Sequence, residues 1–299
     1  MVTPLDQRPR SGPYSGLNAR SAKRFLTEQF RTAGLPFAED DALEIVMAAT
    51  GLDEAAMIMR GTEFLSPEAF ALIMEYSERR LSGEPVDHIL GWREFYGRTF
   101  SISRDVLSPR ADTETLIEHA LAAIKDIEAP HILDLGTGSG AILITLLAER
   151  PDATGVGVDI SKAALRVAQD NAKTLNVDTR ATWRQGDWFA PLKNTARFDA
   201  IISNPPYITP AAMESLETEV KNYDPHIALA GGGDGLEAYR QILRDARDWL
   251  KLHGWIGLEI GFDQDAAVRE LLAAAGFLSI RSYKDLGGND RVICAITNS

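Results

Sequence analysis

An asparagine, two prolines and a tyrosine follow a short apolar run, and together they could hold a planar amino group. The run covers residues 198–203 and predicts a buried strand that ends at Asn204, Pro205, Pro206 and Tyr207. The prolines fix the backbone and remove two N–H donors. The Asn204 side-chain oxygen and the Pro205 carbonyl remain as acceptors for one NH2 group, and Tyr207 packs against its face. We predict that Asn204, Pro205 and Tyr207 are catalytic, and that all four residues bind substrate.

A glycine-rich segment lies between a second apolar run, residues 131–135, and a helical pattern at 141–150. Glycines allow the backbone to approach a ligand closely, and the N-terminus of the helix offers unpaired N–H groups. A nucleotide-like ligand is therefore expected. The predicted cofactor-binding residues of this loop are Gly136, Thr137, Gly138, Ser139 and Gly140.

The spacing of the loop leaves two cofactors open. Gly136, Gly138 and Ala141 satisfy the dinucleotide fingerprint, so a nicotinamide cofactor fits. Asp134 favours a different ligand, because a carboxylate before the loop would repel a pyrophosphate but suits an ammonium and a sulfonium. We therefore predict S-adenosylmethionine, with S-adenosylhomocysteine as the product, and include Asp134 among the residues that bind it.

Two further predicted strands end in residues that suit a nucleoside. Asp159 lies near the end of the strand predicted at 154–160, at about the distance expected for holding ribose hydroxyls. Asp187 and Trp188 follow the strand predicted at 181–185, where a carboxylate could accept from the adenine amino group and an indole could cover the ring. We predict that all three side chains bind the cofactor.

The acceptor motif selects an amino group that is conjugated to a carbonyl or a ring, and such a nitrogen is a poor nucleophile. Holding both of its hydrogens in line with a sulfonium methyl would orient it and stabilise the positive charge that develops on it. Neither a metal nor a strong base is expected. The candidate substrates are a nucleobase amine and the carboxamide of glutamine. The net charge of −12 argues against the nucleobase, because nucleic-acid affinity comes largely from Lys and Arg.

Strand and helix patterns alternate after residue 107. The strand candidates are residues 132–135, 154–160, 181–185, 198–203, 255–260, 279–283 and 292–297. Helical patterns at 141–150, 162–176, 236–250 and 263–275 separate the earlier ones. Such alternation predicts a mainly parallel sheet covered on both faces. The last two runs lack a full helix between them and could pair antiparallel.

Composition and pattern predict an ordinary globular chain with more than one domain. The chain has 299 residues, of which 45% are hydrophobic, enough for two self-sufficient cores. We predict a disordered tail at 1–17, a helical domain at 18–83, a β-hairpin linker at 84–107 and an α/β domain at 108–299. The single cysteine, Cys294, indicates a reducing compartment, and no apolar run approaches the ~20 residues that cross a bilayer. A cytoplasmic location is expected.

From about Asn18 to its end, the sequence resembles the HemK/PrmC family, the glutamine N5-methyltransferases that modify peptide chain release factors. The motifs that carry the resemblance are residues 83–91 (GEPVDHILG), 109–114 (PRADTE), 134–140 (DLGTGSG), 204–208 (NPPYI), 222–225 (NYDP) and 232–236 (GGDGL). The glycine loop alone would indicate any methyltransferase, and the Asn-Pro-Pro-Tyr motif also occurs in DNA amino-methyltransferases. Their combination is specific.

The resemblance implies a Rossmann-like, seven-stranded methyltransferase domain, a β-hairpin linker and a helical N-terminal domain that helps bind the protein substrate. It implies methyl transfer to the glutamine of the Gly-Gly-Gln motif of release factors, in support of translation termination. Carried over by position, the residues that contact S-adenosylmethionine are Gly136, Gly138, Gly140, Asp159, Trp188 and Asn204.

Several alternatives remain open at this stage. A ribosomal-protein glutamine methyltransferase would use the same chemistry, and a nucleic-acid amino-methyltransferase would use a related one. A non-catalytic binding factor and a nicotinamide-dependent oxidoreductase are further alternatives from other classes. We expect a release factor as the partner, no direct contact with nucleic acid or membrane, and a monomer. In the segment that contains Arg110, Asp112 and Glu114, Asp112 could cap a helix and Glu114 could interact with the dipole of its first turn, or the segment could fold over the cofactor.

Overall fold

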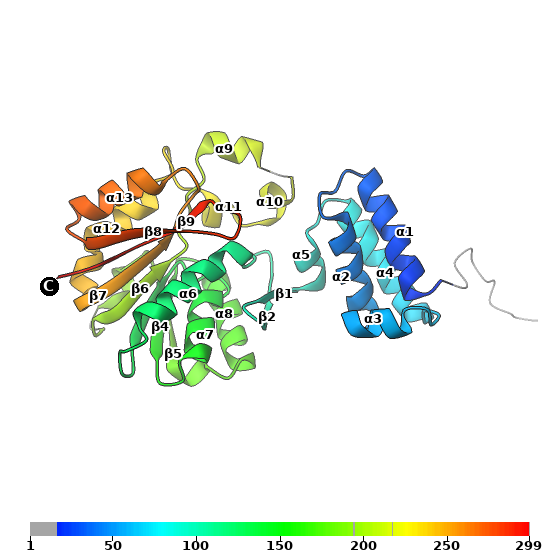
Figure 1. Ribbon diagram of the computed structural model, residues 1–299, viewed down its shortest axis with the longest axis horizontal. Coiled ribbons are helices and arrows are strands. Elements are labelled where there is room, and N and C mark those ends of the chain that lie inside the picture. The colour runs from blue at the N-terminus through cyan, green and yellow to red at the C-terminus, as the bar shows by residue number, and fades with distance from the viewer. Residues whose placement is uncertain (1–16, 194, 217, 299) are drawn as a thin grey trace, which may run out of the picture. The chain divides into compact units, whose positions relative to one another are not determined.

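The computed structural model describes residues 17–193, 195–216 and 218–298. Residues 1–16 of the predicted tail lie outside this range, whereas the carbonyl of Leu17 accepts a hydrogen bond from the amide of Leu65 at 3.0 Å. The described chain forms two compact units, one ending at Leu90 and the other beginning at Gly91 (Figure 1). This boundary falls inside the range that the sequence predicts as a linker.

The first unit consists of packed helices, as the sequence predicts. They are α1 (Ala19–Thr32), α2 (Ala38–Thr50), α3 (Glu54–Arg60), α4 (Pro67–Leu81) and α5 (Val86–Leu90). Asn18 caps α1 by accepting from the amide of Ser21, and Ser66 caps α4 by accepting from the amide of Ala69. The core of the unit includes Leu26, Phe30, Ile45, Val46 and Ile73. Helix α5 occupies residues for which the sequence analysis expected β structure.

A buried ion pair joins two helices of the first unit. Arg80 of α4 is 1% exposed, and its Nε donates to Oδ2 of Asp41, in α2, at 2.7 Å. A second guanidinium nitrogen of Arg80 donates to the carbonyl of Glu84 at 3.4 Å. A guanidinium buried to this degree requires such partners, because its desolvation is otherwise uncompensated.

A β-hairpin opens the second unit. Strand β1 (Trp92–Phe95) pairs antiparallel with β2 (Arg98–Ser101), and Phe95 pairs with Arg98. The two residues between them, Tyr96 and Gly97, have φ values of 50° and 67°. Two consecutive residues with positive φ are the signature of a tight type I′ hairpin turn, which matches the twist of the strands. The predicted hairpin is present with its glycine in the turn.

The second unit is built on a seven-stranded sheet, counted over the described residues. Its strands are β3 (His131–Leu135), β4 (Thr154–Asp159), β5 (Ala181–Gln185), β6 (Phe198–Ser203), β7 (Leu250–Glu259), β8 (Leu278–Lys284) and β9 (Asp290–Ile296). Their order is β5-β4-β3-β6-β7-β9-β8, and β9 runs antiparallel to both of its neighbours. The predicted α/β fold is confirmed, and β7 begins five residues before its predicted start at Trp255.

Helices cover both faces of this sheet. The helices described in this unit, long and short, are η1 (Ala111–Thr113), α6 (Glu114–Ala123), α7 (Ala141–Glu149), α8 (Lys162–Thr174), η2 (Asp178–Arg180), η3 (Ala190–Leu192), α9 (Pro210–Ser215), α10 (Thr218–Tyr223), α11 (His226–Leu229), α12 (Glu237–Trp249) and α13 (Asp265–Ala274). Helices α6, α7 and α8 pack on one face, and α12 and α13 pack on the other (Figure 1). Ile132 belongs to the first core and its neighbour Leu133 to the second, because successive side chains of a strand point to opposite faces.

The order of the strands places a crevice at the sheet edge. The chain proceeds outward from β3 through β4 to β5, and then returns to the other side of β3 as β6. Open α/β sheets bind their ligands at the carboxyl ends of the strands where the order reverses in this way. The loops after β3 and β6 therefore occupy the expected ligand-binding position.

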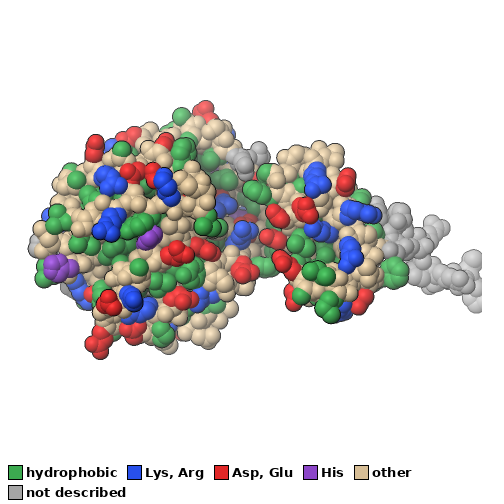
Figure 2. Space-filling model, viewed as in Figure 1, with side chains coloured by type: hydrophobic (Ala, Val, Ile, Leu, Met, Phe, Trp, Pro, Cys, Tyr) green, Lys and Arg blue, Asp and Glu red, His purple; other side chains and the backbone are tan. Residues whose placement is uncertain are grey.

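The surface carries charges of both signs. On the face shown in Figure 2, Lys and Arg side chains alternate with Asp and Glu across the larger unit, and neither sign forms one continuous patch. Over the described residues, no helix has the length and apolar character that a membrane span requires.

We expect the Asp41→Asn substitution to lower the free energy of unfolding of the first unit by about 3 kcal/mol, because it replaces the carboxylate bonded to Nε of the buried Arg80 with a neutral amide. Hydrogen exchange of the α2 and α4 amides measures this change. The matched control is Arg60→Ala, which removes an exposed pair with Glu63 and should leave exchange unchanged. Equal protection in Asp41→Asn and the control would contradict this account of the pair.

Candidate active site

The strand register aligns the predicted site residues along the carboxyl edge of the sheet. Leu135 at the end of β3 pairs with Val158 of β4 on one side and with Ser203 of β6 on the other. Ser203 also donates its hydroxyl to the carbonyl of Leu135 at 2.6 Å. The residues that follow these positions, Gly136 and Asn204, therefore leave the sheet side by side. The structure thus brings the glycine loop and the acceptor motif together.

The glycine loop requires its glycines for two distinct reasons. Gly136, Gly138 and Gly140 all have positive φ, a backbone conformation that residues with a side chain rarely adopt. Gly140 also lacks space, since a Cβ there would lie 2.7 Å from Cδ1 of Ile144 and 3.1 Å from Cβ of Ala168. Gly140 is the N-cap residue of α7. The loop can therefore hold its shape only with these residues.

Asp134 lies behind the loop rather than on the wall of the crevice. Its side chain is fully buried, and its Oδ2 accepts from the hydroxyl of Thr137 at 2.5 Å. Burial raises the pKa of Asp134 to about 7. Its place before the glycine loop in the sequence predicts direct contact with a cationic ligand. The structure instead gives this carboxyl a role in holding Thr137, which does face the crevice.

Asp159 connects the glycine loop to β4. Its two carboxylate oxygens accept from the amide of Gly138 at 2.9 Å and from the amide of Ser161 at 2.8 Å. Burial raises its pKa above the ordinary value. These bonds orient the carboxylate, and each of its oxygens keeps a further lone pair for a ligand hydroxyl.

Trp188 is fixed on the side of the crevice beyond β4. Its backbone has a φ of 44°, a rare conformation for a bulky residue, and its indole nitrogen donates to Oε1 of Gln241 at 2.6 Å. Strain of this kind persists where the surroundings enforce it, often at binding sites. The indole is therefore held in one orientation beside Gly136, whose added Cβ would lie 3.9 Å from it.

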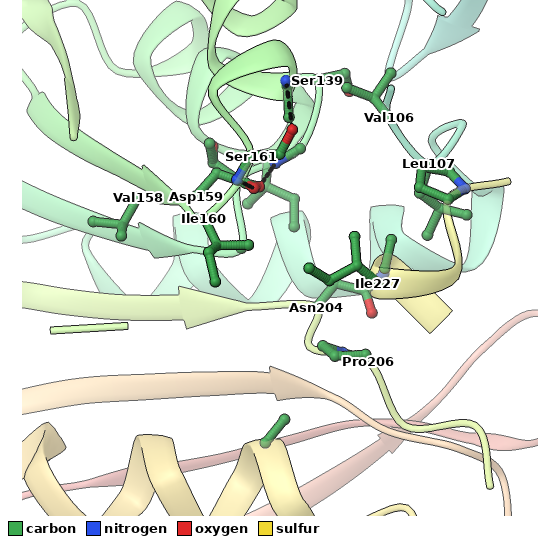
Figure 3. A pocket seen from close by; sticks show the side chains of 18 of the residues that line it. Val106, Leu107, Ser139, Val158, Asp159, Ile160, Ser161, Asn204, Pro206 and Ile227 are labelled. Atoms are coloured by element: carbon green, nitrogen blue, oxygen red, sulfur yellow. Dashed lines mark hydrogen bonds between the residues drawn. The ribbon is translucent and has the colours of Figure 1, made fainter. Parts of the chain in front are cut away.

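The crevice contains a cavity of about 420 Å³, and this volume is in the range of small-molecule sites. Figure 3 shows Asp159 and Ser161 on one side of it and Asn204, Pro206 and Ile227 on the other. The predicted site residues that line it are Gly136, Thr137, Gly138, Ser139, Asp159, Asp187, Trp188, Asn204 and Pro206. Asp134, Gly140, Pro205 and Tyr207 are not among the described residues that line it.

The acceptor motif is supported from behind by a second glycine-rich segment that the sequence analysis did not connect with it. The amide of Gly231 donates to the carbonyl of Ile208 at 2.9 Å. A Cβ on Gly231 would lie 2.6 Å from Cα of Tyr207, and one on Gly235 would lie 2.6 Å from the carbonyl oxygen of Tyr207. Because no side chain fits at Gly231 or Gly235, the backbone of this segment can pack directly against the backbone of the acceptor motif.

Tyr207 itself is largely enclosed. Burial raises the pKa of its hydroxyl to about 12, and the nearby carboxylate of Glu259 acts in the same direction. Arg291 opposes this shift. The phenol is therefore neutral at any physiological pH.

The segment before α6 contributes to the site in a way that differs from a simple helix cap. Thr113, not Asp112, is the N-cap residue of α6, and Asp112 forms an ion pair with Arg291 at 3.1 Å. Arg110 lines the cavity and contacts the buried carboxylate of Asp224 at 2.8 Å. The capping role considered for Asp112 is therefore wrong, and Arg110 belongs to the cavity wall.

Glu259 is a further site residue that the sequence analysis missed. It ends β7, one position after the Leu258 that pairs with Ser203, and it is 2% exposed. Its Oε2 accepts from the hydroxyl of Thr113 at 2.6 Å. Its only sequence signal is a lone acidic residue near the end of the apolar run 255–260. Among the described residues, no group of three or more His, Cys, Asp and Glu side chains could hold a metal ion.

Comparison with known proteins agrees with this geometry. Residues 21–91 match the family described as PrmC N-terminal domain, and residues 110–221 match the Methyltransferase small domain. A crystal structure of a methyltransferase from Pyrococcus furiosus superimposes with a TM-score of 0.51 at 16% identity, covering 75% of this chain and 99% of that one. This likeness supports the fold alone.

Relatives with much higher identity extend over both units. A release factor glutamine methyltransferase of Cereibacter sphaeroides is 43% identical over 279 residues, 93% of this chain and 98% of the relative. One of Bradyrhizobium diazoefficiens is 42% identical over 289 residues, 95% of this chain and 97% of the relative. Because the identity spans almost the full length of these relatives, the chain belongs to the family of release factor glutamine methyltransferases.

Proposed function

We propose that this chain transfers a methyl group from S-adenosylmethionine to the side-chain amide nitrogen, N5, of the glutamine in the Gly-Gly-Gln motif of peptide chain release factors. Methylation of that residue would support translation termination. The observation that carries the proposal is the pairing of Leu135 with Ser203, which puts the glycine loop beside the acceptor motif. The names of the relatives supply the protein substrate.

The residues of the cavity fit S-adenosylmethionine. The open glycine backbone admits a ligand, Asp159 offers acceptors for ribose hydroxyls, and the fixed indole of Trp188 can cover an adenine ring. When bound, the cofactor supplies an electrophilic methyl group on a sulfonium. Asp134 contributes indirectly in this proposal, by holding Thr137 in place.

Asn204 orients the acceptor nitrogen. Its side-chain oxygen and the carbonyl of Pro205 accept the two hydrogens of the glutamine amide, while Tyr207 and Pro206 bound its plane. Such a grip aligns the nitrogen and stabilises the positive charge that develops on it, the two effects that a weakly nucleophilic amide needs most.

The first unit is proposed to bind the protein substrate. Ile58 and Met59 of α3 are 75% and 81% exposed, and Phe64, which follows the helix, is 77% exposed. Large apolar side chains grouped on a surface mark protein-binding sites. We further propose that the protein acts as a monomer in the cytoplasm, with the release factor as its partner.

The first test locates the methyl group. Incubation with S-adenosylmethionine and a release factor should add one methyl, which fragment mass spectrometry should place on the side-chain nitrogen of the Gly-Gly-Gln glutamine. Asn204→Ala should reduce kcat by about 10²–10³, by analogy with the loss of one transition-state hydrogen bond. Asn298→Ala, at an exposed position, is the control. Methylation of a ribosomal protein or of a nucleobase instead would reject the proposal.

The second test concerns the cofactor. We expect Asp159→Ala to weaken S-adenosylhomocysteine binding about 10- to 100-fold, because hydrogen bonds to a charged group are removed and the loop amide of Gly138 loses its acceptor. Calorimetry measures the Kd, with the exposed Asp170→Ala as control. NAD should not bind. Tight NAD binding, or an unchanged Kd in Asp159→Ala, would exclude this assignment of the cavity.

The third test concerns the first unit. Ile58→Ser combined with Met59→Ser should raise KM for the release factor about tenfold through the loss of two apolar contacts. The Kd for S-adenosylhomocysteine should stay the same. The control is Leu252→Ser, which alters an apolar residue of the second unit that is 62% exposed. An unchanged KM would show that the protein substrate does not use this surface.

A further inference from the structure

Glu259 is a buried carboxyl group whose surroundings connect it to the acceptor motif. Ser203 pairs with Leu258, so the next residues, Asn204 and Glu259, leave neighbouring strands together. Glu259 does not line the cavity among the described residues, and it touches neither of the bound molecules proposed above. A carboxyl buried to 2% exposure costs stability, so its retention calls for an explanation.

A directed chain of hydrogen bonds starts at this carboxyl. The hydroxyl of Thr113 donates its single proton to Oε2 of Glu259 at 2.6 Å. Nδ2 of Asn204 lies 3.5 Å from the same hydroxyl oxygen and donates to it. An ionised carboxylate can only accept, and this fixes the direction of both bonds. The NH2 end of the Asn204 amide must then face Thr113.

We infer that Glu259, acting both directly on the Asn204 amide and through Thr113, is a positioning residue that keeps the side-chain oxygen of Asn204 turned toward the substrate amide. This inference rests on the proposed function, in which that oxygen accepts a hydrogen from the glutamine. With the opposite amide orientation, Asn204 would present an NH2 group to another NH2 group. Two hydrogen-bond donors would then face each other, and the amide of the substrate glutamine would lose one of its hydrogen-bond acceptors.

The groups around Glu259 set the pH range in which its carboxyl group is ionised and can position Asn204. Hydrogen bonds from Thr113 and Asn204 and the charge of Arg291 in β9 favour the carboxylate, while Asp112 of η1 opposes it. Tyr207 lies beside it, and the hydroxyl of Tyr239 in α12 donates to the carbonyl of Glu259 at 2.9 Å. Burial outweighs the other influences and raises the pKa of the Glu259 carboxyl to about 7.

Protonation reverses the direction of the chain. A neutral Glu259 can donate to the oxygen of Thr113, whose hydroxyl is then free to donate toward Asn204. That arrangement favours the flipped amide, with NH2 toward the cavity. The carboxylate form is therefore the competent one, and kcat should fall as the pH drops through about 7.

The test compares Glu259→Gln and Glu259→Leu in the full chain, with saturating S-adenosylmethionine and a release factor. Glutamine cannot titrate but can still accept from Thr113, so Glu259→Gln should abolish the fall in kcat below pH 7 and keep at least about a tenth of the activity at pH 8. Glu259→Leu removes the acceptor and should reduce kcat about 10- to 100-fold at every pH. KM and the Kd for S-adenosylhomocysteine should not change.

Two more variants keep the result interpretable. Thr113→Val removes the link through Thr113 but leaves the direct bond from Asn204 to Glu259, so it should lower kcat by less than Glu259→Leu, with no further loss in the double variant. Glu270→Gln, at an exposed site in α13, is the control. The inference is overturned if Glu259→Gln retains the acid limb, if Glu259→Leu keeps the wild-type kcat, or if the loss lies in KM or cofactor affinity. Methylation of another residue by the wild-type protein would instead reject the proposed function.

Discussion

The pairing of β3 with β6 is the constraint on which the active site depends. It brings together two loops whose sequences lie more than sixty residues apart, and the bond from the Ser203 hydroxyl to the carbonyl of Leu135 secures it at the sheet edge. A slip of one residue would turn every side chain of β6 to the opposite face and carry Asn204 away from the cavity. Both loops are rigid in their own right, the first through its glycines and the second through its prolines. Their separation is therefore set by the sheet, and orientation can serve as the main source of catalysis.

Buried or half-buried carboxyl groups of β3, β4 and β7 reinforce this edge. Asp134 holds Thr137, Asp159 holds the amide of Gly138, and Glu259 holds Thr113. Burial raises the pKa of each, which means that each costs free energy to keep charged. Groups of this kind are retained at sites where orientation matters more than stability.

Local sequence was sufficient for the motifs and for the order of elements. Glycines at 136, 138 and 140 and prolines at 205 and 206 constrain the backbone whatever surrounds them, so their roles follow from residue type. Alternating strand and helix patterns were enough for the parallel part of the sheet, and the missing helix before β9 indicated its antiparallel pairing.

The remaining features depend on contacts between distant residues. Asp134 was expected to face the ligand, but its position within β3 buries it behind the loop. The bond from Thr113 to Glu259 spans 146 positions, and no spacing in the sequence signals it. The close approach of Gly231 to Tyr207 likewise exists only once the sheet has formed. Side-chain direction and long-range contact are the properties that residue patterns leave undetermined.

A crystal structure of the protein with S-adenosylhomocysteine and a Gly-Gly-Gln peptide would test the central claim most directly. We expect the glutamine amide nitrogen within hydrogen-bond distance, about 3 Å, of both the Asn204 side-chain oxygen and the Pro205 carbonyl. Its free face should point at the sulfur of the cofactor. A peptide amide bound elsewhere, or an Asn204 that presents its nitrogen to the peptide, would contradict the account.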